Sequence, residues 1–289
     1  RDLVRSRGLG DVYKRQPLMS REEIKETSVL ESLKNIITNR PLLAVILANF
    51  FNSFKSVGGS SESYFWLNNT GSLLNQTICG LFTGIPNYIM VPIAAKMVKK
   101  WGARATSIIA GLFGFFAYMT LFFVGFHPFG QTFKDHYIFN LIWVIFGLTI
   151  CGLPNKILNV SGQIVTAEAL DYMEWKHGLR NEALVTTVQG YFGKLATSVT
   201  GWLSGMVLTW INYVPLTDSL GNAVPQTDPT MLNGIWAVFC ILPALARGLY
   251  GVSFIIYPIH GDLQQQMIIE LAEKRAQRLA EQEAKDHQA

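Results

Sequence analysis

Long apolar runs separated by short polar segments extend over most of the chain, from Pro41 to about Tyr257. A helix needs about 20 mostly apolar residues to cross roughly 30 Å of hydrocarbon, and the runs reach this order of length. Runs of this kind recur too often to form the buried core of a soluble domain. The pattern therefore predicts an all-α membrane protein in which residues 41–257 form a six-transmembrane-helix bundle.

The polar segments between the runs define the expected spans. The first span begins after Pro41 and is expected to be broken at Gly58 and Gly59, with its apolar pattern resuming at Tyr64. The other five are expected at residues 76–98, 106–126, 137–166, 183–211 and 231–257. Lys and Arg concentrate in residues 18–40, 96–104, 171–182 and the tail. Because cytoplasmic loops carry an excess of these residues, both termini are expected in the cytoplasm.

The two ends of the chain differ from the apolar region. Residues 1–16 have neither a secretory nor a helical pattern, and their stretch GLGDVYKRQ resembles a translated sequencing adapter. We therefore expect a non-native tail at 1–16 on a fragment of a longer protein, with a genuine short tail as the alternative. Residues 17–40 are expected to be the remnant of a cytoplasmic loop. Residues 258–289 are expected to form a cytoplasmic tail with an amphipathic helix, in which Glu270 precedes Lys274 by one turn.

The composition agrees with a membrane protein. The chain is 49% hydrophobic and only 15% charged, whereas soluble domains carry about 25% charged residues. The three cysteines lie inside apolar runs without the spacing of metal ligands, so we expect neither a metal site nor a cofactor. Charged residues inside the runs are therefore the informative feature.

Three basic residues are expected deep within spans. Lys194 lies twelve positions beyond Glu182, which is about 18 Å along a helix and close to the middle of the bilayer. Lys156 is similarly deep, and Arg247 lies about ten residues before the expected cytoplasmic end of the last span at Tyr257. The one acidic residue that could lie within a span is Glu62. The sequence thus predicts counter-charges from another part of the protein or from an anionic ligand, with simple snorkelling as the alternative.

Uncharged polar side chains within the spans complete the candidate substrate site. Asn49 and Asn52 share one helical face, which should face protein or water rather than lipid. Hydrogen bonding between helices is an equally good explanation of that face. The candidates for substrate binding are Lys194, Tyr191, Gln189, Asn155, Asn52, Asn49 and Asn87.

The segment AEALDYMEWKHGLRNEA, between the fourth and fifth runs, is the most charged internal stretch. One interpretation is metal binding or acid–base catalysis by Asp171, Glu174 and His177, which would make the protein a membrane enzyme. Their spacing is not an established ligand pattern, so we favour a charged cytoplasmic turn and expect no catalytic residue. In that interpretation the carboxylates pair with Arg180 and lock one face of a transporter. The expected gate residues are Asp171, Tyr172, Glu174, Arg180 and Glu182.

This segment and the VTTVQGYFGK that follows resemble the glycoside–pentoside–hexuronide:cation symporters, a family with the major facilitator fold. The resemblance covers residues 18 to about 275 and implies the C-terminal half of a twelve-helix transporter. It implies that Lys194 lies near the sugar and cation sites, and that the charged segment is the loop between family helices ten and eleven. The resemblance implies that the family's cation-binding carboxylates belong to the N-terminal half, which this chain is expected to lack.

The sequence therefore predicts symport of a sugar or glycoside with Na⁺ or H⁺ by alternating access. Lys156 and Arg247 favour an anionic substrate such as a uronide. The expected partners are the lipid bilayer and an N-terminal six-helix half, with no nucleic acid, and the expected location is the bacterial inner membrane. A transporter-like sensor or interaction protein is the alternative, and the membrane enzyme ranks below it.

Overall fold

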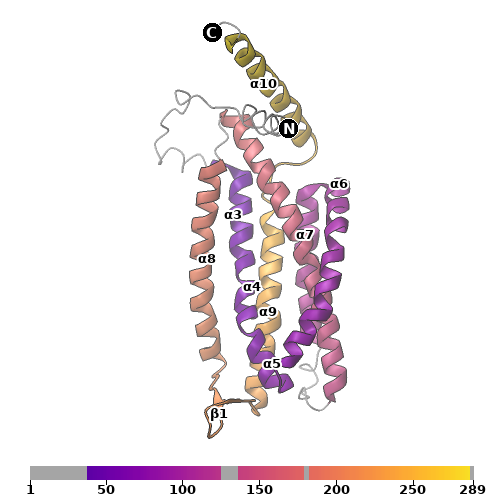
Figure 1. The fold of residues 1–289 in the computed structure, drawn as a ribbon, viewed down its shortest axis with the longest axis vertical. Coiled ribbons are helices and arrows are strands. Elements are labelled where there is room, and N and C mark those ends of the chain that lie inside the picture. The colour runs from indigo at the N-terminus through magenta and orange to yellow at the C-terminus, as the bar shows by residue number, and fades with distance from the viewer. Residues whose placement is uncertain (1–37, 125–135, 179–181, 287–289) are drawn as a thin grey trace, which may run out of the picture. The chain divides into compact units, whose positions relative to one another are not determined.

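The computed structural model describes residues 38–124, 136–178 and 182–286, and residues 39–286 belong to one compact unit (Figure 1). The expected tail at 1–16 and nearly all of the loop remnant at 17–40 lie outside the described residues. Within them every regular element is a helix apart from one short two-stranded hairpin. The predicted all-α class is thus confirmed.

The first apolar run forms three consecutive helices, α3 (Arg40–Ser53), α4 (Lys55–Ser60) and α5 (Glu62–Thr70). The helix begins where the sequence favours it, because the Asn39 side chain accepts a hydrogen bond from the Leu42 amide at 3.2 Å and proline follows the cap. The predicted interruption of this run is therefore confirmed.

The interruptions do not fall at the glycines. They fall at Phe54 and Ser61, whereas Gly58 and Gly59 lie inside α4, so the predicted position of the break was wrong. A Cβ at Gly58 would lie 2.5 Å from Cγ of Pro243. The glycine is needed for close helix packing rather than for breaking the helix.

Helix α6 (Leu74–Val124) contains 51 residues and consists of two legs that reverse at Gly102, where φ is 80° and ψ is 162° (Figure 1). Glycine reaches this positive φ without the steric cost that other residues meet. The turn lies within the basic segment expected to separate two spans. Next to it, Arg104 donates to the carbonyls of Phe254 and Ile255 at 3.1 and 3.0 Å, which joins the second leg to the end of α9.

The expected charged turn between the fourth and fifth runs is mostly helical: α7 (Tyr137–His177) includes most of it, and α8 (Glu182–Trp210) begins soon after. The 41 residues of α7 measure about 61 Å, roughly twice the thickness of the hydrocarbon core. Asp171 and Glu174 therefore lie on the last turns of a long helix and not in a loop. The chain leaves this helix at Gly178, whose φ is 73°.

The polar segment after α8 contains a two-stranded antiparallel hairpin of β1 (Leu216–Thr217) and β2 (Ala223–Val224). The Asp218 carboxylate accepts hydrogen bonds from the Leu220 and Asn222 amides, each at 2.8 Å. A hydrogen bond from the Asn222 side chain, together with these backbone bonds, lowers the pKa of Asp218. The expected polar loop is therefore partly ordered as a turn.

Helix α9 (Pro229–Ser253) packs against α6, α3, α4 and α5. Small residues allow its close approach to α6, because a Cβ at Gly111 would lie 2.7 Å from Cα of Gly251. Aromatic side chains fill the interface between α5 and α9, where the rings of Phe65 and Phe239 stack with centroids 4.8 Å apart. Packing around α9 holds several of the other helices in fixed relative positions.

Four helical stretches among the described residues are long and apolar enough to cross a membrane: Arg40–Thr70, Leu74–Val124, Tyr137–Lys176 and Pro229–Ser253. The second of them is the one that folds back at Gly102. Helix α8 is not among the four. The membrane character of the chain follows from these stretches, whereas the count of six crossings stays a prediction.

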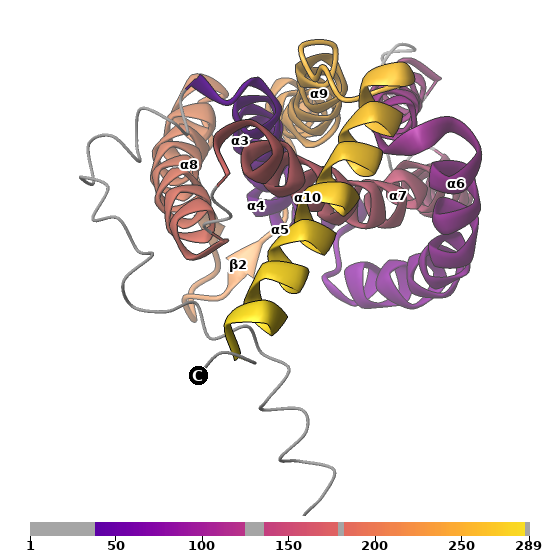
Figure 2. The ribbon, with the colours of Figure 1, turned by 90° about the horizontal axis from the view of Figure 1, so that it is seen from above.

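The tail forms helix α10 (Asp262–Asp286), as the amphipathic pattern predicted. Figure 2 shows this helix lying across the end of the bundle, over the last turns of α7.

Candidate functional site

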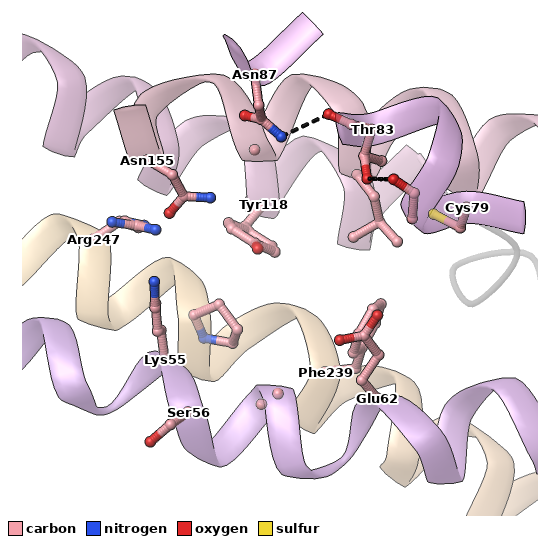
Figure 3. A pocket seen from close by; sticks show the side chains of 16 residues that line it. Lys55, Ser56, Glu62, Cys79, Thr83, Asn87, Tyr118, Asn155, Phe239 and Arg247 are labelled. Atoms are coloured by element: carbon pink, nitrogen blue, oxygen red, sulfur yellow. Dashed lines mark hydrogen bonds between the residues drawn. The ribbon is translucent and has the colours of Figure 1, made fainter. Parts of the chain in front are cut away.

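A cavity of about 310 Å³ lies between α4, α5, both legs of α6, α7 and α9 (Figure 3). The helices that form it come from distant parts of the sequence and meet around the packed face of α9. The polar or ionisable side chains that line it include Lys55, Glu62, Asn87, Tyr118, Asn155 and Arg247. This chemistry is typical of a binding site for a polar small molecule.

One end of the cavity is cationic. The side chains of Lys55, Asn155 and Arg247 point toward one another there (Figure 3). Arg247 is 2% exposed, and its NH1 donates to the Asn52 side chain at 3.0 Å. Within the described ranges neither cation has a carboxylate within 4 Å, and the Arg247 Nε has no hydrogen-bond partner. Cations held this way in a membrane protein are costly unless an anion balances them.

Two amide side chains offer acceptors beside these cations. Asn87 donates to the Thr83 carbonyl at 2.7 Å, and Gly152 makes room for it, because a Cβ there would lie 2.8 Å from the Asn87 amide nitrogen. In the part of the chain that the structure describes, the side-chain oxygens of Asn87 and Asn155 are buried without a partner. Buried acceptors are normally satisfied, so these two are suited to receive hydroxyl groups of a ligand.

Glu62 marks the opposite end of the cavity. It begins α5, seven positions after Lys55, and it is the one carboxylate lining the cavity among the described residues. Its carboxylate accepts a bond from the Trp66 indole at 3.4 Å. The cavity therefore carries charges of opposite sign at its two ends.

The structure brings together only part of the predicted substrate site. Asn87, Asn155 and Arg247 line the cavity, and Asn52 contacts it through Arg247. Asn49 is exposed on α3 and does not line it. Lys55 and Glu62 were not predicted as site residues, because in the sequence they flank what looks like a helix break. The signal that could have found them is that both are charged within one interrupted apolar run.

The three candidates on α8 lie outside the cavity. Lys194 and Tyr191 are exposed, and within the described residues the Lys194 ammonium has no ionic partner. The Gln189 amide nitrogen is buried without a partner among those residues. Helix α8 packs against α3 and α4. These three residues therefore do not line the cavity that contains Asn87 and Asn155, and a shared pocket with them stays a prediction.

Lys156 is stabilised differently from Arg247. Its ammonium lies 4.7 Å from the centroid of the Tyr88 ring. The negative face of an aromatic ring attracts a cation at this distance. Lys156 therefore has a partner on α6 and does not line the cationic end of the cavity.

The predicted gate residues Asp171 and Glu174 bind the tail helix. Arg275 of α10 donates to Asp171 at 2.9 Å and to Glu174 at 2.5 Å, and Arg278 reaches Glu174 at 3.5 Å. The predicted partner, Arg180, lies outside the described residues. We call this arrangement of α7 and α10 the tail clasp.

A second set of contacts extends the tail clasp. The Trp175 indole donates to Glu270 at 2.7 Å, and Lys274 donates to the Trp175 carbonyl at 3.3 Å. Hydrogen bonds from Gln266 and Trp175 lower the pKa of Glu270. The predicted partner of Glu270 was Lys274, but its shortest bond comes from the side chain of Trp175.

The remaining gate candidates lie at the same end. The Tyr172 ring packs on the Trp175 ring with centroids 5.6 Å apart. The Lys176 ammonium lies 5.7 Å from the centroid of the Tyr172 ring. Glu182 lies in the first turn of α8. Among the described residues no group of three His, Cys, Asp or Glu side chains could hold a metal ion. Two members of the alternative catalytic set, Asp171 and Glu174, form ion pairs with α10, and the side chain of the third, His177, lies outside the described part of the chain.

Apolar helices of membrane length around a polar, charged cavity define a polytopic membrane carrier. Residues 12–261 match the family described as MFS/sugar transport protein, and the chain belongs to that family. The family and the related proteins are transporters, not enzymes. The chain is therefore an integral, multi-pass membrane protein, and the resemblance to the glycoside–pentoside–hexuronide symporters is confirmed.

Three relatives illustrate the similarity. The chain is 30% identical over 258 residues to the uncharacterized symporter YjmB of Bacillus subtilis (strain 168), covering 88% of this chain and 51% of that protein. It is 22% identical to the isoprimeverose transporter of Lactiplantibacillus pentosus, over 88% of this chain and 49% of that protein. It is 22% identical to the glucuronide carrier protein homolog of Escherichia coli (strain K12), over 87% and 51%. The chain thus spans about half the length of the curated relatives it matches.

Proposed function

We propose that this chain is the C-terminal six-helix half of a symporter that moves an anionic sugar or glycoside together with Na⁺ or H⁺. Transport would follow alternating access between two halves, with the coupling cation held mainly by carboxylates of the N-terminal half. The proposed location is the bacterial inner membrane, with both ends of this chain in the cytoplasm.

The observation that carries the anionic substrate is the cationic end of the cavity. Lys55 and Arg247 converge there with no carboxylate within 4 Å among the described residues. A carboxylate or sulfonate on the substrate supplies the missing charge. The similarity to a glucuronide carrier homolog supports the same class of substrate.

The neutral part of the substrate has partners in the same cavity. The buried oxygens of Asn87 and Asn155 accept hydrogen bonds from sugar hydroxyls, and Tyr118 contributes an aromatic ring to the wall. Hydrophobic surface with a few placed polar groups is the usual composition of such sites. The substrate is thus oriented with its anionic group toward Arg247.

Lys194 is proposed to act at the boundary with the N-terminal half. Its side chain is exposed on α8, where an ammonium within the membrane needs water or an opposing charge. A carboxylate of the other half is the proposed partner. The tail clasp and Glu182 are proposed to form part of a cytoplasmic gate, which opens and closes as the halves move.

Uptake by the full-length transporter tests the proposal. Phenyl glucuronide and phenyl glucoside differ mainly in one charge, and we expect the glucuronide to be preferred. Arg247→Gln should reduce glucuronide uptake at least tenfold while changing glucoside uptake little. Lys156→Gln is the matched control, because Lys156 carries the same charge outside the cavity.

Three outcomes would count against the proposal. A clear preference for the neutral glucoside would remove the anionic substrate. Uptake that ignores both Na⁺ and proton gradients would remove symport. Binding without any uptake would favour the sensor or interaction protein.

A further inference from the structure

The cavity carries three formal charges that do not cancel. Lys55 and Arg247 are each positive and Glu62 is negative, which leaves one net positive charge among the described lining residues. The other ionisable lining groups are the Cys79 thiol and the Tyr118 phenol, which are ordinarily neutral at pH 7. Charges inside a membrane protein are least costly when they balance.

We propose that the cavity selects substrates with a single negative charge, and that Glu62 is the residue that sets this limit. The inference rests on the proposed function and deepens it. A neutral sugar leaves the net positive charge in place, and a singly charged sugar acid balances it. A doubly charged sugar, such as a sugar phosphate, gives the cavity and its substrate together an excess negative charge, to which Glu62 contributes.

The geometry keeps Glu62 from neutralising the cations directly. Seven positions separate it from Lys55, which is about 10 Å along a helix. Figure 3 shows the Glu62 carboxylate at the end of the cavity away from Lys55 and Arg247. Its hydrogen bond comes from the Trp66 indole at 3.4 Å, and within the described residues it has no ion pair.

The same geometry assigns different tasks to the two ends. The anionic group of the substrate meets Lys55 and Arg247, and the far end of the sugar lies toward Glu62. There the carboxylate accepts hydrogen bonds from hydroxyls, because an ionised carboxylate has acceptors and no donor. A second negative charge, even on the group held at the cationic end, is repelled by Glu62 across the cavity, so Glu62 disfavours dianions.

The expected size of the effect follows from Coulomb's law. One unit charge roughly 10 Å away, at an effective dielectric constant of about 20, changes binding by roughly 15-fold for each charge on the ligand. Glu62→Gln should therefore improve the binding of a dianion relative to a monoanion by roughly 15-fold. Lys55→Gln should shift the preference in the opposite direction, toward the neutral sugar, by a similar factor or more.

The test measures binding of three probes to the full-length transporter in nanodiscs. The probes are phenyl glucoside, phenyl glucuronide and phenyl glucoside 6-phosphate, whose phosphate is close to doubly charged at pH 7.5. Thermal unfolding of each variant confirms that it is folded before affinities are compared. Glu273→Gln is the matched control, because it removes the same charge from α10, outside the cavity.

We expect the wild type and Glu273→Gln to prefer the glucuronide over both other probes. In Glu62→Gln the preference for the glucuronide over the phosphate should shrink or invert. If the wild type prefers the glucuronide but Glu62→Gln leaves that ratio unchanged, the role of Glu62 is refuted while the proposed function stands. If the wild type does not distinguish the glucuronide from the glucoside, the proposed function itself fails. Should Glu62→Gln not fold, an unchanged charge preference in Lys55→Gln refutes the inference.

Discussion

Replacing Arg275 with glutamine should release the tail clasp. Arg275 donates from NH2 to Asp171 at 2.9 Å and to Glu174 at 2.5 Å, and its Nε donates to Glu174 at 3.3 Å. Glu174 is only 6% exposed, so water replaces these bonds poorly when the arginine is absent. Glutamine keeps most of the side-chain length and removes the charge.

The two partners of Arg275 contribute unequally. The Arg275 side chain is 43% exposed and that of Asp171 is 31% exposed, so solvent limits their ion pair to about 0.2–1 kcal/mol. Removing the Arg275 donors from the buried Glu174 carboxylate costs about 1–3 kcal/mol. Together the expected loss is about 2 kcal/mol, which is roughly a 30-fold change in the equilibrium between bound and released α10.

Hydrogen exchange of the α10 amides in the full-length protein measures that equilibrium, because exchange requires local opening. Arg275→Gln should lower the protection of α10 by roughly 30-fold. Arg278→Gln is the control. The Arg278 side chain is 51% exposed and its contact with Glu174 is long, at 3.5 Å, so the protection of α10 should fall only about twofold. Equal protection in wild type and Arg275→Gln, or equal losses in both variants, would refute the reasoning.

Two further predictions concern packing and pH. Gly111→Ala should destabilise the protein by about 1–3 kcal/mol in thermal unfolding, because the added Cβ would lie 2.7 Å from Cα of Gly251. The control Gly84→Ala adds its Cβ to open space and should change the stability little. Equal effects of the two variants would contradict the packing. Hydrogen bonds lower the pKa of Glu270, so the ionised carboxylate stabilises the tail clasp fully at pH values above about 4.3, the pKa of a free Glu side chain. This stabilisation is lost as the pH falls through the lowered pKa of Glu270. The difference in α7–α10 spin-label distances between wild type and Glu270→Gln should be present at pH 7 and vanish at low pH; a difference that persists there would contradict the assignment.

The sequence predicted those features that depend on local pattern. The apolar runs predicted the helices, and the basic segment around Gly102 predicted the reversal within α6. Both features depend on residues that are close together in the sequence. The end of α7 was misjudged because charged residues such as Asp171 suggest a turn. The helix continues there because α10 supplies partners, and Arg275 lies about one hundred positions away in the sequence.

The candidate site was only partly predictable for the same physical reason. Arg247 was singled out because a cation inside an apolar run is conspicuous. Its neighbour Lys55 was not, because their approach depends on how α9 packs against α4, through contacts such as Gly58 with Pro243. Depth along a helix, which drew attention to Lys194, does not specify the direction in which a side chain points.

The most direct test is the structure of the full-length transporter with phenyl glucuronide bound. We expect the glucuronide carboxylate within about 2.7–2.9 Å of the Lys55 ammonium or the Arg247 guanidinium, the usual length of a charge-assisted hydrogen bond. A carboxylate bound at Lys194 or by the N-terminal half, with neither Lys55 nor Arg247 in contact, would contradict the cationic cavity as the substrate site.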